Sequence, residues 1–129
     1  MKINEFPSKK INEVQYVISN VSFSKGINPV TLEANIIQDA DKLEATGAIA
    51  IMRTFSSSGS MNRKFYNQKD PFCENRKLDD MKYAVDLFYT RLLKVHNLMY
   101  TKTAKRIAKL RTVFLKAFLK ELKIELSIW

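Results

Sequence analysis

Apolar and small residues recur at three- and four-residue steps through the second quarter of the chain, without an intervening proline. This spacing places them on one face of a helix. Thr31 is suited to cap the first turn and Glu33 to stabilise it, so the sequence predicts one long helix over 31–55. Ala40 and Gly47 are small and would let another helix approach closely. The positions that define the face are Leu32, Ile36, Ala40, Leu43, Gly47 and Ile51.

Three further helices are predicted from the same kind of periodicity. They cover about 8–22, 79–95 and 101–126, with Asp79 as the cap of the second of these. Three glycines and three prolines are few for 129 residues, which favours long helices over many tight turns. Because this length fits one domain, we expect residues 1–129 to form a single all-α domain.

A long polar segment separates the helix over 31–55 from the next one. Residues 56–77 begin with a serine-rich run at 56–60 and continue through Asp70 and Pro71, a composition typical of loops. Long loops in compact domains often serve as lids or binding loops. A loosely packed insertion is the alternative, and both interpretations stay open at this point.

The chain is strongly basic, with 22 Lys and Arg against 13 Asp and Glu and a formal net charge of +9. Such a charge suits nucleic acid, anionic lipid or phosphorylated substrates, or only a lysine-rich solvated surface. We expect no membrane span, because no apolar run approaches the ~18 residues required. Residues 1–6 lack the apolar stretch of a secretory signal. The single cysteine, Cys73, reads as an inert loop thiol, and a cytoplasmic location is expected.

The predicted helix over 101–126 is amphipathic, with a basic side and an apolar side. The basic side could contact nucleic acid, yet aromatic residues are not interleaved with its lysines as in single-strand platforms. No helix-turn-helix or zinc-finger pattern accompanies it, so a solvated outer face is the simpler interpretation. The basic residues are Lys102, Lys105, Arg106, Lys109, Lys116, Lys120 and Lys123, and the apolar ones are Ala104, Ile107, Ala108, Phe114, Leu115, Phe118, Leu119 and Leu122.

Two aspartates lie in the middle of the helix predicted over 31–55. An unpaired carboxylate next to a core is costly, so it usually pairs, binds a metal or takes up a proton. Asp39 and Asp41 are two residues apart, and a regular helix points them to nearly opposite flanks. Asp41 borders the apolar face with Glu44, whereas Asp39 lies by Lys42. This favours Asp41 as the buried functional carboxylate and Asp39 as a supporting or surface acid, with two solvent-facing acids as the alternative.

Several short blocks follow one another in a fixed order between residue 6 and about residue 126. They are Ser-Phe-Ser at 22–24, Pro-Val-Thr-Leu-Glu-Ala at 29–34, Asp-Ala-Asp-Lys-Leu at 39–43, Gly-Ala-Ile at 47–49, Arg-Thr-Phe at 53–55, Asp-Pro-Phe at 70–72, Leu-Asp-Asp at 78–80, Leu-Leu-Lys at 92–94 and Met-Tyr-Thr at 99–101. Through these blocks the chain resembles the C-terminal part of a bacterial branch of the HD-domain metal-dependent phosphohydrolases.

The resemblance implies an HD-domain-like helical bundle that holds a divalent metal such as Mn²⁺ or Mg²⁺. The family's ligands are one histidine, a His-Asp pair on a later helix and a distant aspartate, which corresponds to Asp41 here. The metal activates water to attack a phosphate ester or anhydride, and nucleotides or similar phosphorylated compounds are the expected substrates. Lys42 and Arg53 would balance charge or touch phosphate, or else form surface salt bridges.

The chain departs from the family pattern at the other metal ligands. His96 is its one histidine, no His-Asp dipeptide is present, and Val21 stands where relatives often have histidine. His96 matches no ligand position and reads as a surface or helix-end residue. Because catalytic sites of this type usually have three protein ligands, the expected bundle is incomplete. The chain is then a truncated or split enzyme, a degenerate relative, or half of a site that a partner chain completes.

An incomplete bundle would expose apolar surface around Ile36, Ala40, Leu43 and Gly47. Such patches favour association, and we expect a homodimer or a complex with an N-terminal-half partner. A different class of function stays open beside this one. A basic helical module would bind nucleic acid or another protein through the helix over 101–126 and the 56–77 loop, without catalysis.

Overall fold

The computed structural model describes residues 7–21, 26 and 28–127, and most of them lie in helices. Lys64 and Tyr83 form one isolated parallel bridge, and no strand occurs in those ranges. The predicted all-α fold is confirmed. None of the helices in the described ranges has the length and apolar character needed to cross a bilayer. The elements are α1 (Ser8–Ser19), α2 (Leu32–Leu43), α3 (Gly47–Ser60), α4 (Ala84–Thr90), the 3₁₀ helix η2 (Leu92–Leu98) and α5 (Lys102–Ser127).

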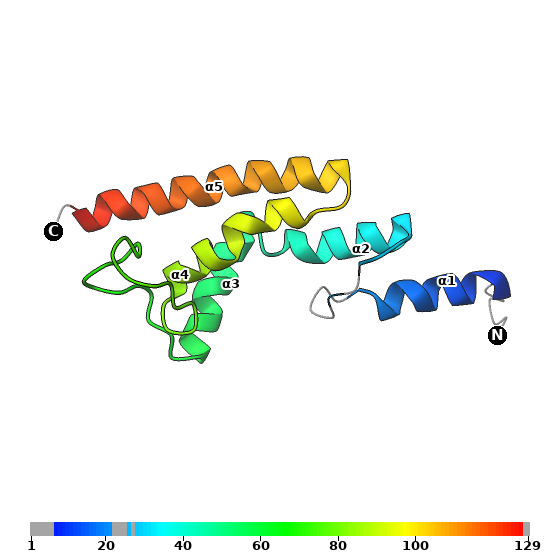
Figure 1. The fold of residues 1–129 in the computed structure, drawn as a ribbon, viewed down its shortest axis with the longest axis horizontal. Helices are drawn as coiled ribbons and strands as arrows, with labels where there is room; N and C mark the ends of the chain where they lie inside the picture. Colours follow the sequence, from blue (N-terminus) through cyan, green and yellow to red (C-terminus); the bar gives the residue numbers. More distant parts are fainter. Residues whose placement is uncertain (1–6, 22–25, 27, 128–129) are drawn as a thin grey trace, which may run out of the picture.

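The long helix α5 runs along one side of most of the molecule (Figure 1). It packs against η2 and α3 and also contacts α2, while α1 packs on α2. The fold is therefore elongated, with α1 and the C-terminal end of α5 at opposite ends. The main core lies between α3, α4 and α5, where the fully buried Phe88 stacks on Phe118 with ring centroids 5.6 Å apart.

The helix predicted over 101–126 is observed as α5. The hydroxyl of Thr101 accepts the backbone N–H of Ala104 at 3.2 Å and caps its first turn. All seven basic residues predicted to face outward are exposed. Phe114 was predicted on the apolar inner side, and this is wrong. Its side chain is 49% exposed, beside the more exposed Leu110 and Val113.

The prediction of one continuous helix over 31–55 is wrong, because a short turn separates α2 from α3. Gly47 has φ +68°, in the left-handed region that ends a regular helix. The Leu43 carbonyl at the end of α2 accepts the Thr46 hydroxyl at 2.5 Å and the Arg111 guanidinium at 3.1 Å. Arg111 also fills the space beside Gly47, where an added Cβ would lie 3.1 Å from its Cγ.

The helix predicted over 79–95 also differs from the observed elements. α4 begins only at Ala84, and η2 follows it as a separate 3₁₀ helix. Asp79 does not cap a helix. Its carboxylate accepts the Lys82 backbone N–H at 3.1 Å in a turn, and its own N–H donates to buried Asp86 at 2.7 Å. These two bonds hold the chain as a turn ahead of α4.

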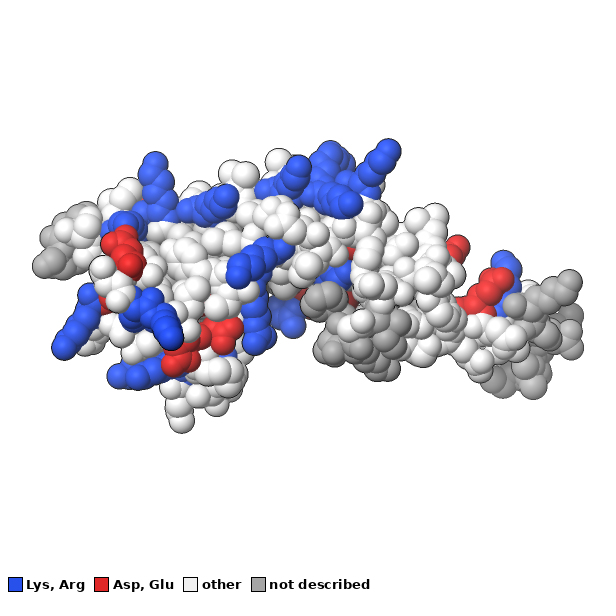
Figure 2. All heavy atoms as spheres, viewed as in Figure 1, with Lys and Arg blue, Asp and Glu red and all other residues white. Residues whose placement is uncertain are grey.

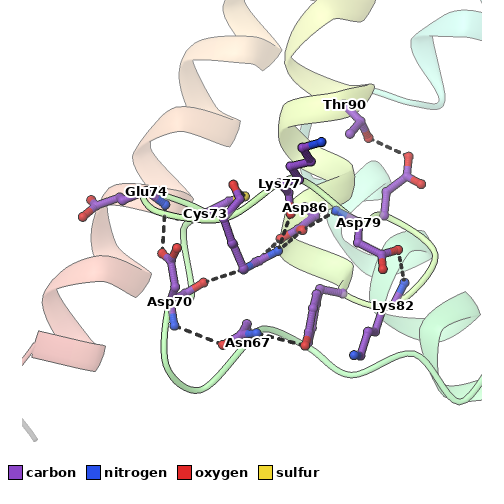
Figure 3. Close-up of polar contacts among 12 residues, drawn as sticks. Asn67, Asp70, Cys73, Glu74, Lys77, Asp79, Lys82, Asp86 and Thr90 are labelled. Atoms are coloured by element: carbon purple, nitrogen blue, oxygen red, sulfur yellow. Dashed lines mark hydrogen bonds and ion pairs between the residues drawn. The ribbon is translucent and has the colours of Figure 1, made fainter.

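The predicted loop starts later than expected, because α3 continues to Ser60. The connection to α4 is packed, which contradicts the interpretation as a loose insertion. The Asp70 carboxylate accepts the backbone N–H groups of Glu74 and Asn75 at 2.8 Å each. Further on, Arg76 forms a bidentate ion pair with Asp86 at 2.5 and 2.6 Å. Figure 3 shows the bond from Glu74 to Asp70 and the ion pair at Asp86, which tie the loop to α4.

The first predicted helix is observed as α1, which ends at Ser19 rather than near residue 22. Its end is joined to α2 by Gln38, whose side-chain amide donates to the Asn20 carbonyl at 2.8 Å. The N-terminal segment 1–6 and the Ser-Phe-Ser block at 22–24 lie outside the described residues.

Candidate functional site

Asp39 is the buried acid of the central pair, which corrects the predicted assignment of the two aspartates. It is 2% exposed. Its two carboxylate oxygens accept the backbone N–H groups of Tyr100 at 2.8 Å and Thr101 at 2.7 Å. These groups lie at the start of α5, where the helix dipole favours a negative charge. Asp39 therefore joins α2 to α5 and has a structural role.

Asp41 lies on the exposed side of α2 and faces an open cavity of about 670 Å³. Side chains from α2, α3, α4 and η2 line this cavity. Its apolar part includes Ala50, Leu87, Leu92 and Val95. Next to an apolar surface the local dielectric is lower, and electrostatic interactions with a bound ligand are stronger there than in open solvent.

Cationic side chains outnumber carboxylates around the cavity of Asp41. Folding brings together cations that lie about fifty positions apart in the sequence. The excess of cations over carboxylates was therefore not predicted from the sequence. A cavity lined by apolar and cationic side chains suits a ligand that carries a phosphate. The cations are Lys42, Arg53, Arg91 and Lys94, and the carboxylates are Asp41 and Glu44.

Lys42 is held from within the fold. It is 5% exposed, its Nζ donates to the Leu98 carbonyl at 2.9 Å, and it lies 3.8 Å from the centre of the Tyr100 ring. Burial lowers the pKa of the Lys42 ammonium, and the charges of Asp39 and Asp41 oppose this effect. Lys42 therefore ties α2 to the end of η2 while adding positive charge to the cavity wall.

Arg53 is the more accessible of the two predicted phosphate contacts. It forms an ion pair with Glu44, and both side chains are about 60% exposed. An exposed pair of this kind contributes only about 0–1 kcal/mol. Its guanidinium can therefore exchange Glu44 for an anionic ligand at little cost. Arg91, on the same cavity, pairs with Asp80 at 3.3 Å and is likewise exposed.

Asp41 does not belong to a complete metal site within the described part of the chain. No group of three or more His, Cys, Asp or Glu side chains there could hold an ion. His96 lies on η2 and is not among the residues that line the cavity. Cys73 lies in the loop, and burial raises the pKa of its thiol, which disfavours a reactive thiolate. Since catalytic sites of this kind use three protein ligands, Asp41 alone does not fit a catalytic metal.

Apolar side chains lie exposed on α2 and α3. Figure 2 shows few charged groups over α2 on the face in view, in contrast to α5. Exposed apolar areas of this kind often mark contact sites. Ile36 and Ala40 are exposed as predicted, whereas Leu43 is partly buried and Gly47 is buried. The most exposed members are Leu32, Ile36 and Ile37 on α2 and Ile49 and Met52 on α3.

Comparison with known sequences gives one informative relative. No family model matches the chain. The protein YpgQ of Bacillus subtilis is 28% identical over 116 residues, which cover 87% of this chain and 51% of YpgQ. The chain thus spans about half the length of the curated relative that it matches.

Solved structures share the fold. The Lin1889 protein of Listeria innocua is 35% identical with a TM-score of 0.75, over 97% of this chain and 61% of that one. An HD-superfamily hydrolase of Bacillus thuringiensis is 28% identical with a TM-score of 0.76, over 97% and 57%. Bacillus subtilis YpgQ, crystallised in complex with ADP, is 26% identical with a TM-score of 0.73, over 94% and 55%. The chain therefore has the helical fold of an HD-superfamily hydrolase over the part that it spans.

Proposed function

We propose that this chain supplies one metal ligand and a phosphate-binding wall to a metal-dependent phosphohydrolase. The observation that carries the proposal is the exposure of Asp41 in a cationic cavity on the fold of an HD-superfamily hydrolase. The proposed substrates are nucleotides or other phosphate esters and anhydrides. The ADP bound to YpgQ, a structure of the same fold, supports nucleotides as the ligand class.

The exposed cations of the cavity fit the phosphate of such a substrate. Arg53 and Arg91 each carry a guanidinium group, and one guanidinium can donate two parallel hydrogen bonds to the oxygens of a phosphate. Lys94 adds a point charge on the same side. Lys42 has its Nζ on the Leu98 carbonyl, so we assign direct phosphate contact to Arg53 first and electrostatic attraction to Lys42.

A divalent ion such as Mn²⁺ or Mg²⁺ needs more ligands than this cavity offers. Carboxylate oxygens suit either ion, and Asp41 and Glu44 border the cavity. Two carboxylates, one of them paired with Arg53, do not make a catalytic site. We therefore propose that the chain alone is inactive and that further ligands come from outside the described residues.

The proposed source of those ligands is a second polypeptide that covers the apolar face of α2 and α3. It would bring a histidine and a His-Asp pair next to Asp41. A second copy of this chain would cover apolar surface but would add only another His96, because the sequence has one histidine and no His-Asp dipeptide. A heteromeric partner is therefore proposed for activity, ahead of a homodimer.

The test is co-expression of the chain with the polypeptide encoded directly upstream of it. The purified complex is expected to release phosphate from nucleotides in the presence of Mn²⁺, and the chain alone is not. Asp41→Asn should abolish this activity, and Lys120→Gln, an exposed position on α5 that does not line the cavity, serves as the control. Equal hydrolysis by the Asp41→Asn complex would contradict the proposal.

The basic face of α5 supports a second candidate function, nucleic-acid binding without catalysis. Within the described residues, Lys123 is the one cation of this face with an ion pair, to Glu74 at 2.5 Å. Charge reversal at Lys105, Lys109 and Lys116 should then weaken binding to oligonucleotides and reduce its dependence on salt concentration. Unchanged binding in this triple variant would exclude α5 as the contact.

A further inference from the structure

A second cavity lies just after the C-terminal end of α3, which ends at Ser60. It measures about 580 Å³ and is lined by residues 63–69 and Tyr83. It shares no lining residue with the cavity of Asp41. Three of the lining residues are cationic, namely Arg63, Lys64 and Lys69, and none of the described residues that line it is Asp or Glu. The cavity therefore concentrates positive charge and attracts anions.

Arg63 is the buried cation in this cavity, and it lacks a charged partner among the described residues. It is 9% exposed, and its buried Nε has no hydrogen-bond acceptor in the described part of the chain. One Nη donates to the Met61 sulfur at 3.5 Å, and sulfur is a weak acceptor. No carboxylate among the described residues forms an ion pair with it. Because burying an uncompensated charge is costly, the cation of Arg63 in the cavity wall favours an anion bound there.

The backbone around the cavity is fixed before any ligand binds. The N–H of Lys64 donates to the Lys82 carbonyl at 3.0 Å, and the Lys64 carbonyl accepts the N–H of Ala84 at 2.8 Å. The side-chain amide of Asn67 donates to the Tyr83 hydroxyl at 2.9 Å. Asn67 also accepts the backbone N–H groups of Lys69 and Asp70, and Figure 3 shows the bond from Asp70. A rigid site loses little conformational entropy on binding, which favours affinity.

An exposed aromatic ring lies next to these cations. Phe65 is 58% exposed, and it contacts Phe55 edge to face with ring centroids 5.3 Å apart. Its position is thus held by the core while its surface faces solvent. Aromatic side chains stack on nucleobases, and this contact adds to the attraction between cations and phosphate. A ligand with both a phosphate and a planar ring matches this combination.

We propose that the cavity of Arg63 binds the phosphate of a nucleotide-sized ligand, with Lys64 and Lys69 at its rim and Phe65 against the ring. This site would be separate from the cavity of Asp41 and would need no metal. The proposal does not rest on the proposed hydrolase activity. A bound phosphate would compensate the buried charge of Arg63, which does not line the cavity of Asp41.

The test is a titration of the ¹⁵N-labelled full chain with ADP or inorganic pyrophosphate in EDTA. Backbone amide shifts of residues 63–69 report on this cavity separately from the cavity of Asp41. Lys69→Gln should weaken both ligands about fivefold, and Arg63→Gln about tenfold or more, as expected for loss of a charge-assisted hydrogen bond. Phe65→Leu should weaken ADP and leave pyrophosphate unchanged. Lys120→Gln on α5 is the control for net charge and should change neither.

Three results would overturn the proposal. The first is the absence of shifts at residues 63–69 in millimolar ADP and pyrophosphate. The second is an equal loss of affinity in Lys69→Gln and Lys120→Gln, which would indicate only general attraction to a basic protein. The third is displacement of ADP by oligothymidylate with an affinity that rises with its length, which would indicate a nucleic-acid surface. If Arg63→Gln fails to fold, the exposed Lys64→Gln and Lys69→Gln variants decide the question.

Discussion

Asp39 and Asp41 are two positions apart on α2 and occupy opposite environments. Asp39 is buried and accepts the N–H groups of Tyr100 and Thr101. Asp41 is exposed and faces the cavity. The first therefore holds α5 against α2, and the second is available to a ligand. One short motif thus combines a structural acid with a candidate functional acid, and substitutions can separate the two roles.

Asp39→Ala is expected to lower the free energy of unfolding by about 2–3 kcal/mol, because two partly buried N–H groups lose a charged acceptor. Asp41→Ala should change it by less than about 0.5 kcal/mol, as an exposed substitution does. Urea denaturation followed by circular dichroism measures both values. Equal effects of the two substitutions would contradict the assigned roles.

The break between α2 and α3 predicts opposite effects of alanine at two glycines. Gly47→Ala should destabilise the chain by about 1–2 kcal/mol, because an L-residue is strained at a positive φ. The new Cβ would also press on Arg111. Gly59 is helical with open space around it, so Gly59→Ala should stabilise by about 0.5 kcal/mol. Thermal unfolding of both variants compares them, and a stabilised Gly47→Ala would refute the observed turn.

The ion pair between Arg76 and Asp86 is predicted to be the strongest single link between the loop and α4. The Asp86 side chain is fully buried, and its hydrogen bonds raise the pKa of the Arg76 guanidinium. Asp86→Ala should cost about 3 kcal/mol or more, because it leaves a partly buried cation unpaired. Glu74→Ala is the matched control: it removes the exposed pair with Lys123 and should cost less than about 1 kcal/mol.

Acid should loosen the loop around Asp70. The backbone N–H groups of Asn75 and Glu74 hold the pKa of the Asp70 carboxyl below its ordinary value of 3.8. A lowered pKa in the folded state contributes stability that is complete above the unfolded value and is lost as pH falls through the folded one. The amide resonances of Glu74 and Asn75 should therefore titrate with a midpoint below 3.8, and Asp70→Asn should remove this transition. A midpoint at or above 3.8 would show that these bonds do not favour the carboxylate.

Local patterns predicted much of the fold. The apolar and basic periodicity of α5 fixed its bounds to within a residue at each end, because helical spacing extends over the whole element. The prediction of one long helix over 31–55 was wrong at one position, Gly47. Gly47 occurs inside an otherwise continuous pattern, and its left-handed φ is combined with a contact to Arg111, more than sixty residues away. Periodicity within a segment carries no information on such a contact.

The candidate site was predictable only in part for the same reason. Helical geometry separated Asp39 from Asp41, but the burial of Asp39 depends on N–H groups at Tyr100 and Thr101. Arg91 was not expected at the cavity, because α4 and η2 bring it there. No sequence pattern indicated a role for Arg63, because its burial and the missing acceptor for its Nε depend on the folded structure.

The central claim is that Asp41 is a ligand in a metal site that a second polypeptide completes. Mn²⁺ affinity of the co-expressed complex, measured by electron paramagnetic resonance, tests it most directly. Asp41→Asn is predicted to weaken Mn²⁺ binding by more than the about 10–100-fold typical of a supporting residue, while the control Lys120→Gln leaves it unchanged. Equal Mn²⁺ affinity in the wild-type and Asp41→Asn complexes would contradict the claim.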